Sequence, residues 1–277
     1  MQAFTSLVIL LLIVFGNGTL SHAYGSSKDA LRLGVFPYLS PTRMDDIFSP
    51  VSQKLARGLQ QPVRFRTSSN LPRFKQNLLS GDYDIVIAQP ILYPLAVDQL
   101  GYLPLIRMEE SISSVVLVLQ DSPYRSVQDL QGRTIATPPV NGPVVLLAKK
   151  HFSEQGIDPD SAFEFVPNKT AGTCMQKVLA RRVEACIAPH FAVRPFERSM
   201  GVRLRILQRT RGIPNRAVLV HPRVPENLRQ QIRNTMLSWK FSNEGRELLR
   251  SIDASGFVDL DDHEYDVVRN LIKDQDD

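Results

Sequence analysis

The sequence predicts an α/β protein with two similar lobes joined by a two-strand hinge. Two observations support this prediction. Short apolar runs alternate with helical patterns from residue 28 onward, which is typical of sheets with largely parallel strands. The order strand, helix, strand, helix, strand also occurs twice at nearly equal spacing, on either side of a central apolar segment. We therefore expect two Rossmann-like lobes, lobe 1 over 28–118 and 214–277 and lobe 2 over 119–213.

The individual elements follow from the residue types and the period of each run. Strands are expected where short runs are apolar and β-branched, at 31–36, 63–66, 84–88, 134–136, 163–166 and 184–188. Helices are expected where apolar residues recur at helical spacing, at 47–59, 74–79, 144–154 and 173–180. The apolar runs 115–119 and 216–220 are expected to carry the chain between the lobes and back. Three further helical patterns are expected to pack on lobe 1, at 225–241, 244–252 and 263–273.

The composition excludes several classes of protein. The chain has 277 residues, of which 43 % are hydrophobic and 22 % charged, so neither a disordered chain nor a coiled coil is expected. The net charge of +5 favours anionic small molecules only weakly. The densest basic run has no aromatic residues between its arginines, and we expect a solvated or partner-facing surface there rather than a nucleic-acid site: Arg203, Arg205, Arg209 and Arg211.

The first 23 residues are typical of an export signal. An apolar run over 7–15 is followed by Gly16 and by a small-x-small site, Ser21-His22-Ala23. We expect cleavage before Tyr24 and a chain that is soluble outside the cytoplasm. The alternative is an uncleaved anchor, since no charged side chain occurs before Lys28.

Two cysteines, Cys174 and Cys186, are the complete set in the chain. The first lies in a predicted helix and the second in the strand that follows, so they could face each other across a helix–sheet contact. An oxidising compartment would allow a disulfide between them. The alternative is that both are small buried apolar residues.

Polar groups are predicted to converge where strands lead into helices. Ligands of parallel α/β sheets bind beyond the carboxyl ends of the strands, and helix N-termini attract anions there. Several of these turns place proline at the start of a helix, as in Ser40-Pro41 and Gln89-Pro90, although good helix starts alone would explain this. The candidate ligand-binding residues are Phe36, Tyr38, Ser40, Thr67, Gln89, Tyr93, Thr137, Asn141, Lys169, Thr170 and His190.

Two of these candidates have competing interpretations. Lys169 is the one cation placed directly in a predicted strand-to-helix ligand turn, where it would pair with an anion, but it could equally be a solvated loop lysine. Tyr38 could stack on or cap a ligand, but it could equally be a half-buried packing residue.

Motifs of enzymes and metal sites do not occur in the sequence. It contains no GxSxG, no HExxH, no Walker phosphate loop and no GxGxxG after a strand. The five histidines show no ligand spacing: His22, His151, His190, His221 and His263. We therefore expect no catalytic residues, no metal and no cofactor.

Four stretches resemble the phosphate, phosphite and phosphonate-binding proteins of ABC importers: 34–41 (GVFPYLSP), 81–88 (GDYDIVIA), 121–133 and 244–257. They occur in the right order and span nearly everything from residue 31 to the C-terminus. The resemblance implies a type II periplasmic-binding-protein fold, a periplasmic location and a monomer that holds a small anion in the inter-lobe cleft. The anion would be phosphonate-like or phosphate-like, or a small organic acid, and the partner would be a membrane permease.

Two departures leave the ligand and the role open. Phosphonate binders of this family usually have a hydroxyl-rich run where this chain has 140–143, and often a histidine where it has Ala171. The resemblance therefore does not imply phosphonate specificity. The alternative function is a sensory or scaffold protein that uses the same cleft to signal to a membrane partner such as a histidine kinase.

Overall fold

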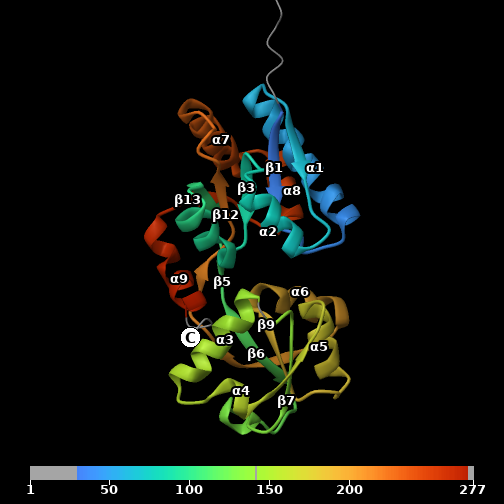
Figure 1. Cartoon of the computed structure of the whole chain (residues 1–277). Coiled ribbons are helices and arrows are strands. Elements are labelled where there is room, and N and C mark those ends of the chain that lie inside the picture. Colours follow the sequence, from blue (N-terminus) through green and yellow to red (C-terminus); the bar gives the residue numbers. More distant parts are fainter. Residues whose placement is uncertain (1–29, 141, 274–277) are drawn as a thin grey trace, which may run out of the picture.

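The computed structural model describes residues 30–140 and 142–273 and shows two lobes joined by a narrow connection (Figure 1). The predicted export signal over 1–23 and the candidate residue Asn141 lie outside the described residues. Lobe 1 is built on a six-stranded sheet and lobe 2 on a five-stranded sheet. Within the described ranges, no helix is both long and apolar enough to cross a membrane.

The sheet of lobe 1 has the strand order β13-β4-β12-β3-β1-β2. Its strands are β1 (Leu31–Val35), β2 (Val63–Arg66), β3 (Ile85–Ala88), β4 (Leu103–Met108), β12 (Ala217–Val220) and β13 (Phe257–Asp259). β1 pairs in parallel with β2 and β3, whereas β12 runs antiparallel to β3 and β4. The helices of this lobe are α1 (Pro41–Leu59), α2 (Leu71–Leu79), α7 (Glu226–Ser238), α8 (Asn243–Ser251) and α9 (Asp266–Lys273). The three C-terminal helices therefore return to lobe 1, as predicted.

The sheet of lobe 2 has the order β10-β6-β9-β7-β8. Its strands are β6 (Ser114–Leu119), β7 (Thr134–Thr137), β8 (Glu164–Pro167), β9 (Ala185–Pro189) and β10 (Leu204–Arg209). β7 pairs in parallel with β8 and β9, and β6 runs antiparallel to β9. The helices are α3 (Pro143–Glu154), α4 (Pro159–Ala162), α5 (Ala171–Leu179) and α6 (His190–Met200). α3 covers one face of this sheet, and α5 and α6 cover the other.

Two short strands join the lobes. β5 (Ser111–Ile112) and β11 (Ile213–Pro214) pair antiparallel and form a sheet of their own. The predicted boundary at residue 118 is wrong, because β6 pairs with β9 and β10 and 114–118 therefore belongs to lobe 2. An apolar run shows that a strand is buried, but it carries no information about the sheet in which the strand pairs.

The pairing fixes which ends of the strands face the other lobe. β6 begins directly after β5, and its first residue, Ser114, pairs with Pro189 at the end of β9. β12 begins shortly after β11, and its first residue, Ala217, pairs with Ala88 at the end of β3. The carboxyl ends of both parallel strand sets therefore lie at the hinge side of their lobes and face one another.

The first helix starts earlier than predicted. The sequence predicts a helix from residue 47, and α1 begins at Pro41. Proline fits the first helical position because it has no N–H that would need a partner. Pro50 lies inside α1 and weakened the helical pattern without ending the helix. Met44 and Phe48, on the early turns, are fully buried against the lobe 1 core.

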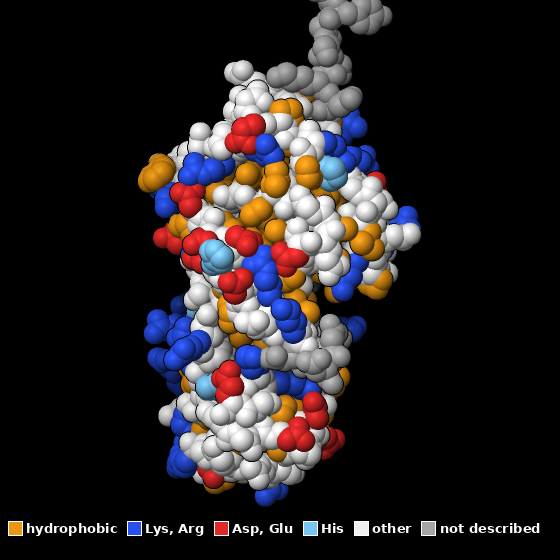
Figure 2. Space-filling view, turned by 60° about the vertical axis from the view of Figure 1, so that its left-hand side comes forward, with side chains coloured by type: hydrophobic (Ala, Val, Ile, Leu, Met, Phe, Trp, Pro, Cys, Tyr) orange, Lys and Arg blue, Asp and Glu red, His pale blue; other side chains and the backbone are white. Residues whose placement is uncertain are grey.

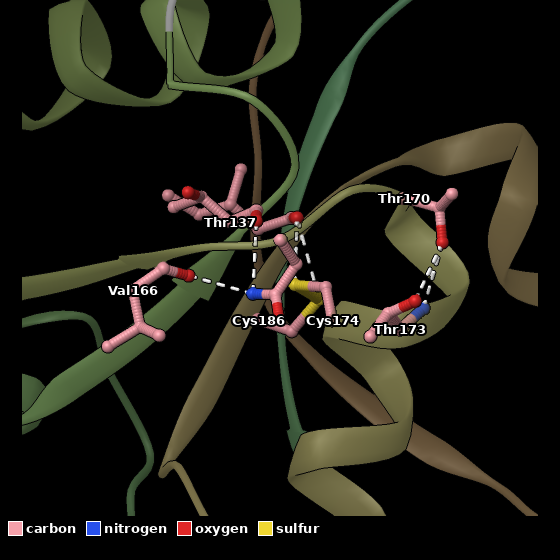
Figure 3. Close-up of a disulfide and its surroundings, with 8 residues drawn as sticks. Thr137, Val166, Thr170, Thr173, Cys174 and Cys186 are labelled. Atoms are coloured by element: carbon pink, nitrogen blue, oxygen red, sulfur yellow. Dashed lines mark hydrogen bonds between the residues drawn. A yellow bond between two sulfur atoms is a disulfide. The ribbon is translucent and has the colours of Figure 1, made fainter. Parts of the chain in front are cut away.

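A disulfide joins Cys174 in α5 to Cys186 in β9, and both residues are fully buried (Figure 3). The predicted helix and strand do face each other, so the pairing that the sequence allowed is present. The bond ties α5 to the face of the sheet opposite α3.

Candidate functional site

The candidate site lies between the facing carboxyl ends of the two parallel strand sets. Figure 2 shows that the molecule narrows to a waist between the lobes and that lysine and arginine side chains gather there. On lobe 2, α3 starts at this edge, directly after β7. Its cap residue, Gly142, offers no side-chain acceptor, and Pro143 at the first position has no N–H. The N-terminus of α3 therefore has no side-chain cap from its cap residue, Gly142.

Two buried hydroxyl groups lie at this edge, on the sheet face that α3 covers. Thr137 is 0 % and Ser114 is 1 % exposed, and neither side-chain oxygen makes a hydrogen bond with any described residue. Alternation along the strands puts Ser114 on the same face as Val116 and Thr137 on the same face as Ile135, which is the face that α3 covers. Buried polar groups in folded proteins are normally hydrogen-bonded, so these hydroxyls are suited to meet an external acceptor.

The neighbouring turn of lobe 2 is ordered by its own polar groups. Asn168 donates its backbone N–H to the Thr137 carbonyl at 2.7 Å and its side-chain amide to the Val166 carbonyl at 2.7 Å (Figure 3). Thr170 caps α5, because its hydroxyl oxygen accepts a bond from the Thr173 N–H at 3.1 Å. Lys169, between them, is exposed. Thr170 thus has a structural role in this loop, and Lys169 is available to a ligand.

Aromatic residues and an arginine form the facing surface of lobe 1. Phe36 is buried and Tyr38 half-buried at the end of β1, with ring centroids 5.1 Å apart. The Arg216 guanidinium lies over both rings, 4.8 Å from the Tyr38 centroid and 5.6 Å from that of Phe36. Burial raises the pKa of Tyr38 against the opposing influence of Arg216, so its phenol is protonated at neutral pH.

Sequence reasoning missed Arg216. It follows the hinge strand β11 and precedes an apolar run, and nothing in that pattern indicates that it reaches Tyr38. A weak signal was available: Arg216 is the last charged residue before a strand that leads back from the hinge.

Three other candidates lie at the same edge of lobe 1. Ser40 precedes α1 as its cap residue, and its side chain is exposed and makes no cap hydrogen bond. Gln89 occupies the corresponding position before the 3-10 helix η1 (Pro90–Leu92). Thr67 follows β2, and its buried hydroxyl has no partner. None of these three side chains makes a hydrogen bond with another described residue, so all three stay candidates for binding a ligand.

The prediction for Tyr93 is wrong. Its side chain is fully buried, donates a hydrogen bond to Asp262 at 2.6 Å, and stacks on Tyr265 with ring centroids 3.8 Å apart. Burial and the Asp262 carboxylate raise its pKa. Because the chain turns into η1 after Gln89, Tyr93 points into the packing between η1 and the C-terminal segment rather than to the strand ends.

His190 belongs to the joint between α6 and the hinge. Its Nδ1 accepts a bond from the Ser113 N–H at 3.3 Å, and its backbone N–H donates to the Ser113 carbonyl at 3.0 Å. Arg209 donates its Nε to the Ser113 hydroxyl at 2.9 Å. Burial, and then the charge of Arg209, lower the pKa of His190, so it is neutral at pH 7. This histidine fixes α6 to the chain segment that leaves the hinge.

Other parts of the described chain offer weaker sites. A groove on the outer face of lobe 1 runs between α1 and α8, but its cations Lys54 and Arg57 are both paired with Glu244. Among residues 30–140 and 142–273, no cluster of His, Cys, Asp and Glu could hold a metal ion. The facing strand ends are therefore the best candidate for a ligand site.

Comparison with known structures gives the same fold. PhnD1 from Prochlorococcus marinus (MIT 9301), in complex with methylphosphonate, superposes with a TM-score of 0.75 at 13% identity, covering 89% of this chain and 98% of that one. A binding protein component of an ABC phosphonate transporter from Pseudomonas aeruginosa gives 0.72 at 15% identity, with 90% and 87% covered. A Xanthomonas citri protein bound to ATP gives 0.71 at 16% identity, with 87% and 95% covered. These likenesses establish a two-lobed type II periplasmic binding fold.

The family assignment rests on the sequence as well. No protein of curated function matches the chain significantly. Residues 33–265, by contrast, match the family described as "ABC transporter, phosphonate, periplasmic substrate-binding protein". That range includes both sheets, the hinge and the candidate site, and the family binds substrates without transforming them. The chain therefore belongs to the phosphonate-binding family of periplasmic ABC-transporter substrate-binding proteins.

Proposed function

We propose that this protein binds a small oxyanion between its lobes and delivers it to the permease of an ABC importer. The ligand would be a phosphonate, a phosphate-like anion or a small organic acid. The observation that carries the proposal is that the N-terminus of α3 lies at the same edge as the buried hydroxyls of Thr137 and Ser114, which have no hydrogen-bond partner among the described residues. Helix N-termini and hydroxyl donors together suit a tetrahedral or planar oxyanion. The family and its description as periplasmic support export of the chain after loss of 1–23.

Ligand binding is expected to draw the lobes together. The candidate groups lie on both lobes. Among the described residues, the chain passes between the lobes through the short strands β5 and β11, and α3 of lobe 2 also contacts α9 of lobe 1. A ligand that touches both lobes favours the conformation in which both can reach it. Small-angle scattering should therefore show a smaller radius of gyration with ligand than without, and it also tests the expectation of a monomer. The sensory alternative gains no support, since the family match is to a transporter component.

The first test is a thermal-shift screen with methylphosphonate, phosphate, sulfate and small carboxylates, followed by calorimetry of the best ligand. At 100 times its dissociation constant, a ligand should add about 2.7 kcal/mol of stability. Thr137→Val should weaken binding by about 1.5 to 3 kcal/mol, because it removes a hydrogen bond to a charged group. It should not destabilise the unliganded protein, because that hydroxyl has no partner to lose. Lys169→Ala should weaken binding by a similar amount.

The matched control is Thr134→Val, the same substitution at the opposite end of β7. Thr134 bonds to Glu164 at 3.2 Å, far along the strand from the α3 start, so its loss should leave affinity unchanged. The proposal fails if no anion stabilises the protein, or if Thr137→Val and Lys169→Ala both bind the best anion as tightly as the parent does.

A further inference from the structure

Arg216 differs from the other partly buried arginines of lobe 1. Within the described residues of that lobe, the others all form ion pairs with carboxylates: Arg32, Arg107, Arg229, Arg233 and Arg269. No ion pair involving Arg216 occurs among the described residues. Its side chain donates a hydrogen bond to the Ile252 carbonyl at 3.1 Å, and it also bonds to the Tyr38 hydroxyl. A partly buried cation without a counter-ion is costly, so a site for an anion is expected beside it.

The surroundings hold this guanidinium in one place. The Tyr38 and Phe36 rings lie under it, and cations are attracted to aromatic faces. The backbone of Arg216 is fixed as well, because its carbonyl accepts a bond from the Met108 N–H at 3.0 Å. Asp253 is near enough to affect the pKa of Tyr38, yet it is exposed and makes no ion pair with Arg216. The remaining N–H groups of the guanidinium are therefore positioned to bind an anion at its edge.

Arg216 and the α3 N-terminus lie on opposite lobes, on edges that face each other. Arg216 directly precedes Ala217, which pairs with Ala88 at the end of β3. The α3 N-terminus lies at the corresponding edge of lobe 2, together with Thr137 and Ser114. The site thus has two separate electropositive centres, one on each lobe. One small oxyanion needs only one of them.

We infer that the ligand carries a second anionic group, a carboxylate, and that Arg216 binds it. The inference rests on the proposed function, in which the first oxyanion group binds at the α3 N-terminus. A guanidinium presents two parallel N–H donors that match the two oxygens of a carboxylate, and stacking on aromatic rings leaves that edge free. The same charge disfavours a ligand that carries an amine. The substrate class is therefore a carboxylated phosphonate or a related dianion with two separated acidic groups.

Calorimetry with two isosteric probes tests this inference. Phosphonoacetate and phosphonoacetamide have the same shape around the phosphonate, but only the first carries a carboxylate. The protein should bind phosphonoacetate at least about tenfold more tightly than phosphonoacetamide. A tenfold difference in affinity corresponds to the free energy of a charge-assisted hydrogen bond. In Arg216→Gln that ratio should fall to about one, with the affinity for the amide nearly unchanged. 2-Aminoethylphosphonate should bind more weakly than methylphosphonate to the parent protein, and Arg216→Gln should relieve this difference.

Three controls test whether the preference depends on the position of Arg216, on the paired donors of its guanidinium, and on a folded variant. Arg211→Gln removes an exposed arginine next to the hinge and should leave the ratio intact. Arg216→Lys keeps the charge without the paired donors, so it should retain only part of the preference. Thermal unfolding without ligand shows whether each variant is folded, and Arg216→Lys serves in place of Arg216→Gln if the latter is not.

The outcomes separate the two proposals. If the parent binds all these phosphonates with a ratio near one, or if Arg216→Gln keeps the parental ratio, the inference about the carboxylate is wrong and the proposed function stands. If the parent binds none of the phosphonates and no other oxyanion in the screen, the proposed function is wrong and the inference fails with it.

Discussion

The two lobes share the order strand, helix, strand, helix, strand, but they are stabilised by different interactions. Lobe 1 buries large aromatic side chains, including Trp239, Tyr83 and Tyr102. Of the largest fully buried side chains in the described chain, Phe152 alone belongs to lobe 2. The face of the lobe 2 sheet under α5 and α6 has small residues such as Ala136 and Ala188, and the disulfide lies among them.

A buried carboxylate of lobe 1 has two arginine partners. In lobe 1, Asp84 is 8 % exposed and accepts hydrogen bonds from Arg32 and Arg223. In lobe 2, Arg181 and Asp121 form an ion pair in which both side chains are exposed. Small side chains bury little apolar area, and exposed ion pairs contribute little. One chain can thus build the same topology twice, with aromatic packing in one lobe and a covalent link among small side chains in the other.

The largest effect is expected from removing the disulfide. The double variant Cys174→Ala, Cys186→Ala should destabilise lobe 2 by about 3 kcal/mol, the chain-entropy value for a loop of this length. Amide hydrogen exchange should accelerate in α5 and β9 and change little in β1 and β3. Thiol counting on the unfolded, unreduced parent should find no free thiol.

The comparison between the lobes provides the control for this variant. Trp239, the single tryptophan, lies in lobe 1 and reports on that lobe by fluorescence. Equal acceleration of exchange in both lobes would show that the disulfide stabilises the molecule as a whole. The prediction that it stabilises lobe 2 in particular would then be wrong. Two free thiols in the parent would also contradict it.

The next effect is expected in lobe 1, from Asp84→Asn. Burial disfavours the charged carboxylate, but hydrogen bonds from the Arg32 N–H and from the Arg223 and Arg32 guanidiniums outweigh it and lower the pKa of Asp84. The ionised form is thus favoured by folding, and its contribution is lost as the pH falls below about 3.8 and through the folded-state pKa. At pH 7, Asp84→Asn should reduce the free energy of unfolding by about 2 kcal/mol. Urea titrations at pH 7 and pH 3 measure both effects.

Asp82→Asn is the matched substitution at the surface. The Asp82 side chain is half-exposed, and its Oδ1 lies 3.9 Å from Nη1 of Arg32. Loss of this carboxylate should therefore change the free energy of unfolding little. An equal loss from Asp82→Asn and Asp84→Asn would show that overall charge, and not the buried carboxylate, stabilises lobe 1.

The smallest effect concerns His190 at the joint of lobe 2 with the hinge. Its folded pKa lies below the ordinary value of 6.5, so the unfolded chain takes up more protons as the pH falls below that value. Stability should therefore decrease from pH 7 to pH 5, and His190→Gln should show less of this decrease. His221 in lobe 1, whose pKa is also lowered by burial and by Arg223, contributes to the same range in both proteins.

The same substitution at the exposed His263 supplies the control for His190. A decrease that is identical in the parent, His190→Gln and His263→Gln would show that protonation of His190 does not oppose folding. The joint would then tolerate a charged imidazole beside Arg209.

Much of the fold and part of the site could be predicted from local sequence. The parallel strands follow from apolar runs, and the start of α3 at Pro143 follows from the geometry of proline. Because parallel strands place their carboxyl ends at one edge, Tyr38 and Thr137 could be expected at a ligand site before any contact was known. β4 and α6 were not expected, since each contains a proline, Pro104 in β4 and Pro195 in α6, which weakens the local pattern.

Other features depend on contacts between residues that are distant in sequence. The sequence by itself determined the α/β class, the two lobes, the facing strand ends and the helix and strand that carry the cysteines. Only the tertiary structure decided that β6 pairs in lobe 2, that Tyr93 turns away to Asp262, and that Arg216 lies over Tyr38. The physical reason is that backbone propensity and hydrophobic period act over a few residues, whereas sheet partners and side-chain neighbours are chosen when the whole chain packs.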